Sequence, residues 1–278
     1  MTSLALAIAT KGEWDPQKML AALTQAGIDP STQVHVACDP AHLPEASTAG
    51  LSVHSLADAS LFDLWGLAIE QAKADWIAIL HADALPEPGW FAAMTNAIER
   101  DGWSDGYWGP VEPGFATSDA RMIGYLTEYV QFNSPIAAGM KEVPGSNLVL
   151  PRQRLAGGDF SKTRLLGEGL APRLVETAKV RYARPLEFGE YCARRFRHGR
   201  AYAAKRAPRV PLAKAIPLAL VLPVVRTWRV LSHAWHYPKL RAAALGWLSA
   251  IFAAETCWSV GELVGYVTRN PGNPSGLA

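Results

Sequence analysis

The pattern of apolar and polar residues divides the first 100 positions into alternating strands and helices. Short, nearly unbroken apolar runs predict buried strands at residues 3–10, 32–39, 51–56 and 75–80. Longer stretches with apolar residues every three or four positions predict helices at residues 15–27, 58–74 and 87–100. Strands that alternate with helices are typical of an α/β domain with a largely parallel sheet.

Local signals mark the ends of two of these helices. Asp15 can cap the first one, Pro16 suits its first turn, and Gly27 ends it. Asp58 is the expected cap of the second helix.

After residue 101 the pattern is less regular. A turn-rich stretch surrounds a short strand at 101–114, and Gly145, Ser146 and Asn147 read as an ordinary turn before a strand. The other predicted elements are a helix at 118–132 capped by Ser118 or Asp119, a strand and basic turn within 143–155, a helix at 166–178, a strand at 179–185 and a strongly basic helix at 186–206.

The C-terminal part contains two apolar stretches. Residues 215–225 are broken by prolines and are shorter than the ~20 residues that a membrane-spanning helix needs. Residues 242–267 are long enough but carry Glu255 and Glu262, seven positions apart on one helical face. Carboxylates that face lipid are costly, so we expect these acids to be paired inside a helical hairpin. The expected partners are Arg226, Arg229 or a backbone donor. An interfacial or re-entrant hairpin, a soluble core and spanning helices all stay open.

Composition supports one large domain, or a domain with an appendage. The chain has 278 residues, is 49% hydrophobic and contains ten tryptophans, which excludes a disordered protein. Cys38, Cys192 and Cys257 are far apart and lack CxxC spacing, so they predict neither a disulfide framework nor a zinc site, and they suit a reducing compartment. The apolar run at 3–10 lacks the basic start of a signal peptide and is interpreted as a strand.

Charge is divided unequally along the chain. Residues 1–150 contain 6 Lys and Arg against 18 Asp and Glu, a net of −12, whereas residues 151–278 contain 21 against 7, a net of +14. An acidic half suits metal ions, and a basic half suits phosphates, anionic lipid headgroups or nucleic acid. The alternative is that the two halves only attract each other.

Polar residues follow three of the predicted strands. Thr10, Asp39 and Asp83 come at strand ends, with Glu13 and His81 close by. In parallel sheets, ligands bind at the carboxyl ends of strands. The acids could contact a ribose or a base edge, and the Asp83 carboxylate suits a divalent cation that neutralises a leaving diphosphate. The alternatives are that Asp83 caps a turn or helix and that Asp39 starts a turn with the proline after it.

Two further features carry candidate chemistry. Glu168, flanked by glycines at an expected helix start, is either a general base or an acid favoured there by the helix dipole. The basic helix has no acid among its last thirteen residues, so its cations either contact phosphate or form a solvated surface. These cations are Arg194, Arg195, Arg197, Arg200, Lys205 and Arg206.

The motifs, taken in chain order, resemble a known family. They are TKGE after the first strand, an aspartate after the second, HADALPEPGW, PGSNLVLPR, GEG followed by RL, and HGRAYAAKR. Over about residues 3–206 this order resembles the family 2 glycosyltransferases with a GT-A fold, and the tail resembles the membrane-apposed helices of bacterial members. His81 stands where the first acid of the family's DxD signature is expected, and Gly169 replaces an acid after Glu168.

The resemblance implies a GT-A nucleotide-diphosphosugar transferase fold with a Rossmann-like mixed sheet and a C-terminal helical appendage. Asp83 corresponds to the last acid of the DxD signature, which binds Mn²⁺ or Mg²⁺ and the sugar diphosphate. Thr10, Glu13, Asp39 and His81 would complete the donor site. Glu168 would deprotonate a hydroxyl acceptor, such as a lipid-linked glycan, with inversion at the sugar.

The expected organisation is a transferase domain at 1–206, with a nucleotide-binding half at 1–110 and an acceptor half at 111–206. Helices at 207–278 would lie against the cytoplasmic face of the inner membrane. The residues expected to contact phosphate or an anionic membrane surface are Arg195, Arg197, His198 and Arg200. A catalytically decayed nucleotide-sugar-binding or scaffold protein is the alternative. A nucleic-acid binder is disfavoured because the basic cluster holds few aromatic residues.

Overall fold

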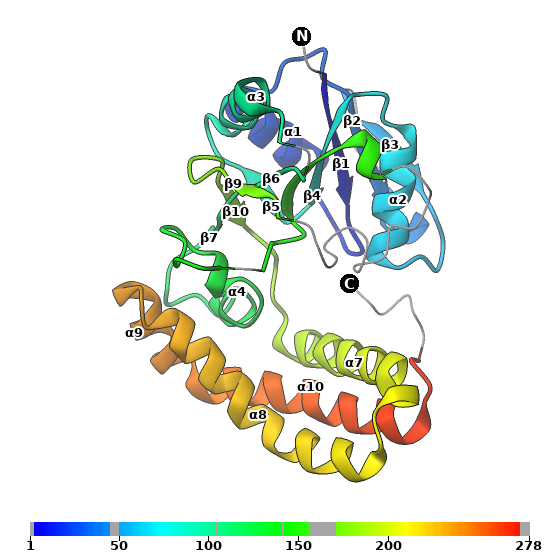
Figure 1. The fold of residues 1–278 in the computed structure, drawn as a ribbon, viewed down its shortest axis with the longest axis vertical. Helices are drawn as coiled ribbons and strands as arrows, with labels where there is room; N and C mark the ends of the chain where they lie inside the picture. The colour runs from blue at the N-terminus through cyan, green and yellow to red at the C-terminus, as the bar shows by residue number, and fades with distance from the viewer. Residues whose placement is uncertain (1–2, 45–49, 104, 141, 156–170, 273–278) are drawn as a thin grey trace. The chain divides into compact units, whose positions relative to one another are not determined.

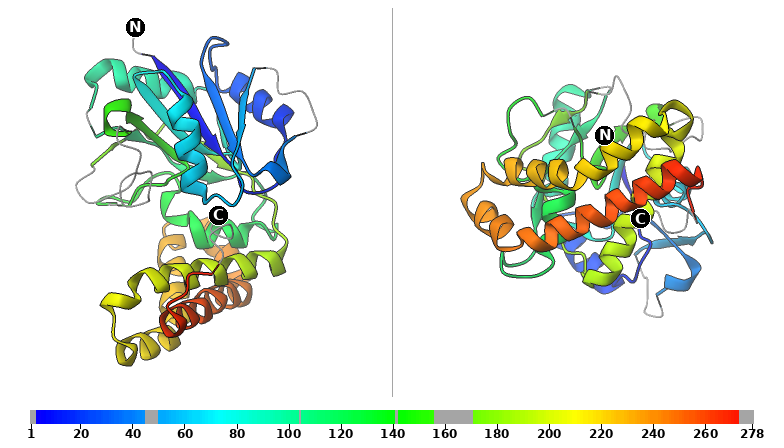
Figure 2. Two further views of the ribbon diagram at one scale, coloured as in Figure 1. Left: turned by 90° about the vertical axis from the view of Figure 1, so that its right-hand side faces the viewer. Right: turned by 90° about the horizontal axis from the view of Figure 1, so that it is seen from below.

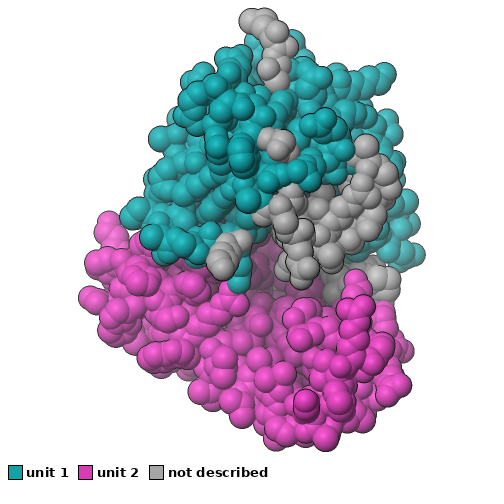
Figure 3. Space-filling view, viewed as in Figure 1, with its two compact units in different colours: residues 1–114, 132–183 teal, residues 115–131, 184–278 magenta. Residues whose placement is uncertain are grey.

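The structure is a computed structural model that describes residues 3–44, 50–103, 105–140, 142–155 and 171–272. The chain forms two compact units (Figure 3). Unit 1 comprises residues 1–114 and 132–183, and unit 2 comprises residues 115–131 and 184–278.

Unit 1 is built on a seven-stranded mixed sheet with the order β3-β2-β1-β4-β8-β6-β9 (Figure 1). Its strands are β1 Leu4–Ala9, β2 Val34–Cys38, β3 Ser52–Ser55, β4 Trp76–His81, β6 Tyr107–Trp108, β8 Asn147–Pro151 and β9 Arg173–Leu174. The first four are parallel, as the alternating pattern predicts, whereas β8 runs antiparallel to both β4 and β6. The apolar pattern of β8 marks a buried strand but carries no information about its direction. The α/β class, the mixed sheet and the expectation of a largely parallel sheet are therefore confirmed, since β6 and β9 also pair in parallel and β8 alone is reversed among the described strands of this sheet.

A smaller sheet and the helices of unit 1 accompany the main sheet. The smaller sheet has the order β5-β10-β7, with β5 Ala84–Pro86, β10 Val180–Tyr182 and β7 Val111–Pro113. The helices are α1 Pro16–Gln25, α2 Leu61–Gln71, α3 Trp90–Asp101 and the short α5 Arg152–Leu155. A 3-10 turn, Pro40–His42, follows β2.

Capping chemistry explains where the first helices begin. The Asp15 carboxylate accepts the backbone N–H groups of Gln17 at 2.9 Å and Lys18 at 3.1 Å, as predicted. The expected cap at Asp58 is wrong, because Ser60 and Asp63 form a reciprocal capping box that starts α2 at Leu61.

Two later predictions also need correction. The helix expected at 118–132 is the shorter α4, Met122–Glu128, followed by a 3-10 turn at Val130–Phe132. The described part of the helix expected at 166–178 contains β9 instead. There the Arg173 N–H donates to the Gly106 carbonyl at 2.9 Å, and the Val175 N–H donates to the Trp108 carbonyl at 2.8 Å. Pairing with β6 thus overrides the local helical pattern.

Asn147 is a buried junction rather than a turn residue. It is the first residue of β8, and its side-chain oxygen accepts the indole N–H of Trp90 at 2.9 Å. Its amide nitrogen donates to the carbonyls of Pro110 at 3.0 Å and Ala178 at 2.8 Å. One fully buried side chain therefore ties β8 to α3 and to two connections between strands.

Unit 2 is helical. It contains α4 together with α7 Phe188–Arg206, α8 Leu212–Ala234, α9 Pro238–Gly246 and α10 Leu248–Thr268. Because α7 packs along α10, it belongs to this unit, whereas a boundary after residue 206 was expected. The views in Figure 2 show α8 and α10 lying side by side.

Glycines allow the backbones of α7 and α10 to touch. A Cβ atom at Gly261 would overlap the carbonyl oxygen of Phe196, and one at Gly265 would overlap that of Arg200. Both pairs are 65 positions apart, so the two helices run parallel in a fixed register. Cys192 and Cys257 share this register one turn earlier, so their thiols are neighbours. Burial and the Cys257 thiol raise the pKa of Cys192 to about 11, so the Cys192 thiol is protonated at neutral pH.

The C-terminal apolar stretches differ from their prediction. The prolines do not break the first stretch, because α8 continues through Pro217 and Pro223 over 23 residues. The second stretch forms two helices, α9 and α10, that meet at a bend of 73°. By length and composition alone, α8 could cross a membrane, and so could the bent pair if it counts as one span. The helical appendage expected at the C-terminus is confirmed.

We predict that Asn147→Ala strongly destabilises unit 1. The variant removes the partners of the buried Trp90 indole N–H and the Ala178 carbonyl, at about 1–3 kcal/mol each, whereas the Pro110 carbonyl keeps the Val180 N–H at 3.1 Å. The free energy of unfolding, measured by urea denaturation with tryptophan fluorescence, should fall by about 3 kcal/mol or more. Asn96→Ala, at an exposed position of α3, is the matched control and should change it by less than about 0.5 kcal/mol. Equal small losses in both variants would show that the Asn147 junction is dispensable.

Candidate functional site

The carboxyl ends of three neighbouring parallel strands lie at one edge of the main sheet. Ala9, at the end of β1, pairs with Ala37 on β2 and His81 on β4. Beyond this register, the Thr10 N–H donates to the Ala37 carbonyl at 3.0 Å, and the Ala82 N–H donates to the Ala9 carbonyl at 3.1 Å. The strand-end residues singled out in the sequence are thus brought to one edge, where parallel sheets bind ligands.

His81 and Asp83 form a tight turn at the end of β4. The Asp83 N–H donates to Nδ1 of His81 at 3.1 Å, and the Asp83 carboxylate lies 3.3 Å from the same nitrogen. The Asp83 carbonyl accepts the Ala183 N–H at 2.7 Å, which holds the turn against the segment after β10. Because Nδ1 accepts a hydrogen bond, the neutral imidazole carries its proton on Nε2. This buried Nε2 has no hydrogen-bond partner among the described residues.

The turn fits a metal ion only in part. Asp83 offers a carboxylate, the ligand that hard divalent cations prefer, whereas the Nε2–H of His81 is a donor in this arrangement and not a metal ligand. Within the described part of the chain, no group of three or more His, Cys, Asp or Glu residues could hold a metal ion. The oxygen atoms of a bound diphosphate would supply further ligands to a cation at Asp83.

The other residues at this edge differ in exposure. Thr10 is buried, and its hydroxyl donates to the Gly12 carbonyl at 3.2 Å, while Glu13 is exposed. Asp39 is partly buried and accepts the Ala41 N–H at 3.0 Å, so it caps the following 3-10 turn. The turn role considered for Asp39 is thus present, and it leaves the second carboxylate oxygen for other contacts.

Sequence reasoning did not select Lys11 as a site residue. Its ammonium group donates to the Ala59 carbonyl at 2.7 Å, which places a cation at the same edge as Thr10. The only signal was its position within the TKGE motif. The expected base Glu168 lies outside the described residues.

The basic helix α7 presents only part of its charge to solvent. Of the four residues expected to contact phosphate or membrane, Arg197 alone is exposed. Arg195 is buried and forms an ion pair with Glu255 at 2.6 Å, so its guanidinium can contact neither a phosphate nor a membrane surface. Arg200 donates to the Asn270 carbonyl at 2.9 Å, and His198 is partly buried. The physical reason is that cations placed all around a helix must include some that face its neighbour.

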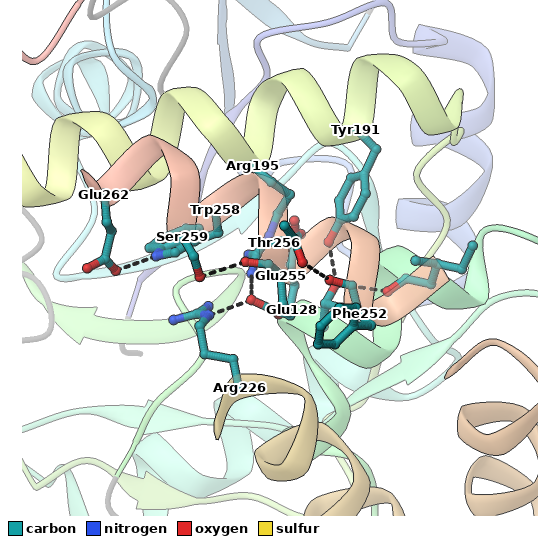
Figure 4. A network of polar contacts seen from close by, with 12 residues as sticks. Glu128, Tyr191, Arg195, Arg226, Phe252, Glu255, Thr256, Trp258, Ser259 and Glu262 are labelled. Carbon is teal, nitrogen blue, oxygen red and sulfur yellow. Dashed lines mark hydrogen bonds and ion pairs between the residues drawn. The ribbon is translucent and has the colours of Figure 1, made fainter. Parts of the chain in front are cut away.

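A buried carboxylate connects three helices of unit 2 (Figure 4). Glu255 on α10 accepts hydrogen bonds from Arg195 of α7 and Arg226 of α8. Both guanidinium groups lie over the indole ring of Trp258, at 4.5 Å and 4.4 Å from its centroid. The prediction that Glu255 meets Arg226 inside a helical hairpin is confirmed. Glu262 accepts the Trp258 indole N–H at 2.5 Å, and burial raises the pKa of Glu262.

A second titratable cluster joins α4 to α7. Burial opposes ionisation of Glu128, but the neighbouring Arg194, at 3.2 Å, and Arg184 bring its pKa below the ordinary value. Burial, together with Arg194, Arg195 and Arg184, lowers the pKa of His198 to about 3 despite the nearby Glu128. His198 is therefore neutral at physiological pH and does not add to the positive charge of α7.

We predict that His198 makes the stability of the protein depend on pH. Its pKa of about 3 in the folded state lies below the ordinary value of 6.5, so the unfolded chain binds more protons in that window. Stability is then fully present above about pH 6.5 and is lost as the pH falls toward about 3. In His198→Gln, the free energy of unfolding should fall less steeply between about pH 7 and about pH 4, by up to about 1 kcal/mol per pH unit.

The matched control for this prediction is His236→Gln, at an exposed histidine beyond α8. It should keep the slope of the unmodified protein in the same urea titrations. Identical slopes for His198→Gln and the unmodified protein would rule out His198 as the source of the pH dependence.

Comparisons with known proteins identify no family. Neither a scan against models of protein families nor a search among characterised proteins finds a match. Among solved structures, the chain is similar to "Crystal structure of GalNAc-T7 with UDP, GalNAc and Mn2+", with 11% sequence identity and a TM-score of 0.47. The match covers 66% of this chain and 44% of that chain, so it spans less than half of the neighbour's length. A likeness of this degree carries no functional conclusion.

Proposed function

We propose that this protein transfers a sugar from a nucleotide-diphosphate sugar to a hydroxyl acceptor, with inversion at the sugar carbon. The observation that carries the proposal is the set of polar residues at one carboxyl edge of three adjacent parallel strands, ending in the held turn at 81–83. These residues are Thr10, Glu13, Asp39, His81 and Asp83. The resemblance of the ordered motifs to family 2 glycosyltransferases supports the same assignment.

Four of these five residues have a proposed role toward the donor. Asp39 and Glu13 would contact the nucleoside, and the Asp83 carboxylate would hold Mn²⁺ or Mg²⁺ against the diphosphate. When bound, the cation would stabilise the negative charge of the leaving diphosphate. The Nε2–H of His81, which is buried without a partner among the described residues, would donate a hydrogen bond to a phosphate oxygen. In this proposal, His81 replaces a metal ligand of the DxD signature with a hydrogen-bond donor.

The acceptor side of the reaction is assigned to Glu168. Its carboxylate would take the proton of the acceptor hydroxyl, whose oxygen forms a bond to the anomeric carbon as the bond to the diphosphate breaks on the opposite side. The acceptor class that we propose is a glycan, either lipid-linked or part of a polysaccharide.

A second candidate function is nucleotide-sugar binding without turnover. Two observations favour it. The described residues offer the metal a single carboxylate at the end of β4, and Gly169 replaces the acid that the resemblance leads one to expect after Glu168.

A donor screen tests both candidates. The protein is incubated with a panel of nucleotide-diphosphate sugars and Mn²⁺ or Mg²⁺, and release of the nucleoside diphosphate is measured without an acceptor. Slow hydrolysis of one donor, stopped by a chelator, is the expected result. Calorimetric binding of a donor without hydrolysis would support the binding protein, and the failure of all donors to bind would contradict both.

We predict that Asp83→Asn weakens metal-dependent donor binding by about 10- to 100-fold, because a charge-assisted contact to the cation is lost. Calorimetry with donor and Mn²⁺ measures the change. Asp29→Asn, an exposed acid before the amino end of β2, is the matched control and should bind like the unmodified protein. Unchanged binding in Asp83→Asn would remove Asp83 from the site.

We also predict that Glu168→Gln keeps donor binding and lowers the turnover number by about 10²- to 10⁴-fold, the usual contribution of a general base. Single-turnover assays with the donor found in the screen measure both quantities. Near-normal turnover would transfer the base role to another acid, such as Glu142.

A further inference from the structure

The helix α8 is built with its large apolar side chains facing outward. Its buried residues recur every three or four positions and are mostly small: Ala215, Ala219, Pro223, Thr227, Val230 and Ala234. Its exposed apolar residues are larger and include Leu220, Val221, Val224, Val225 and Trp228. Leu220 and Trp228 are each 70% exposed. A surface helix of a water-soluble protein has the opposite arrangement, with its large apolar residues toward the core.

The exposed residues of α8 form one continuous face. Positions 220, 221, 224, 225 and 228 follow the i, i+1, i+4, i+5, i+8 spacing of a single helical side. We call these five residues the outer face of α8. Exposed apolar surfaces of this kind mark sites of interaction.

The positive charge around the outer face of α8 favours an anionic partner. From residue 207 to residue 247 the chain contains no Asp or Glu and six cations. Arg226 is paired with Glu255, while Arg209, Lys214 and Lys239 are exposed near the two ends of α8. An apolar face with cations at both ends and no acid complements an anionic bilayer surface. A second copy of the chain would bring two sets of like charges together.

The packing of α8 against its neighbours limits the orientations that it can adopt at a bilayer. Its inner side packs on α10 and α4, and Arg226 is bound to the buried Glu255. Spanning the membrane by α8 alone would separate Arg226 from Glu255 and leave its guanidinium unpaired in the lipid. Spanning by the whole unit would carry α7 into the lipid, with Arg197, Lys205 and Arg206 exposed. An orientation in the plane of the membrane avoids both costs.

We infer that the outer face of α8 is a membrane-binding surface that lies in the plane of an anionic bilayer, with its apolar side chains inserted at the level of the headgroups. This surface lies on α8, within the segment at 207–278 that was expected to lie against a membrane, and not on the basic helix α7, where the sequence placed the phosphate or membrane contacts. The inference does not depend on the proposed sugar transfer, because it uses only the residues of unit 2.

The test compares binding of the purified full chain to vesicles of phosphatidylcholine with and without phosphatidylglycerol, by co-sedimentation. The variant is Val224→Glu with Trp228→Glu, and circular dichroism checks that it folds, as exposed positions allow. The matched control is Leu43→Glu with Leu56→Glu, which adds the same charge at two exposed apolar positions of unit 1.

We expect the unmodified protein and the control to bind the anionic vesicles and the α8 variant to bind at least about 10-fold more weakly. Equal binding of both variants would overturn the assignment to α8. Failure of the unmodified protein to bind anionic vesicles would overturn the membrane role. Light scattering that shows a dimer dispersed by the α8 variant, without vesicle binding, would assign the face to a second copy and likewise overturn it.

Discussion

A single buried carboxylate, Glu255, holds the helical unit in its arrangement. It accepts hydrogen bonds from Arg195 and Arg226, which reach it from two different helices and stack on the same indole. A buried charge is tolerated only when it is paired, so removing Glu255 would leave the buried guanidinium of Arg195 without its carboxylate. The three helices that supply these residues must therefore assemble together. The same contact fixes the rotation of α8 about its own axis, and with it the side that faces outward.

The close approach of α7 and α10 reinforces this arrangement. Gly261 and Gly265 on α10 bring its backbone against the carbonyl groups of α7, which leaves no room for side chains between the two helices. Packing by small residues is typical of helices whose surroundings provide no hydrophobic driving force for association. The small residues on the inner side of α8 continue this pattern. Because α8 packs through small residues and a buried ion pair, most of its large apolar side chains lie at the surface.

Unit 1 is organised around its main sheet and not around buried ions. Its polar residues gather where parallel strands end, and backbone hydrogen bonds hold the turn at His81 and Asp83 in place. His81 stands where an acid is usual. Its Nδ1 accepts the Asp83 backbone N–H, and its Nε2 is buried without a hydrogen-bond partner among the described residues. The two units thus divide the proposed work, with polar chemistry at a sheet edge in one and attachment to an apolar, anionic surface in the other.

The sequence alone determined the α/β class, the first strands and helices, the strand-end acids and the need of Glu255 for a buried partner, because periodicity, capping residues and the cost of a buried charge are local or pairwise properties. It left Arg226, Arg229 and a backbone donor open as that partner, and the structure selects Arg226 together with Arg195. It could not determine the antiparallel direction of β8, the strand at Arg173 or the role of Asn147. Those depend on partners distant in the chain. It also assigned membrane and phosphate contacts to Arg195, which tertiary packing buries against α10. Which side of a helix packs against a neighbour depends on tertiary contacts. In α8 these contacts bury the small residues and leave the large apolar residues exposed.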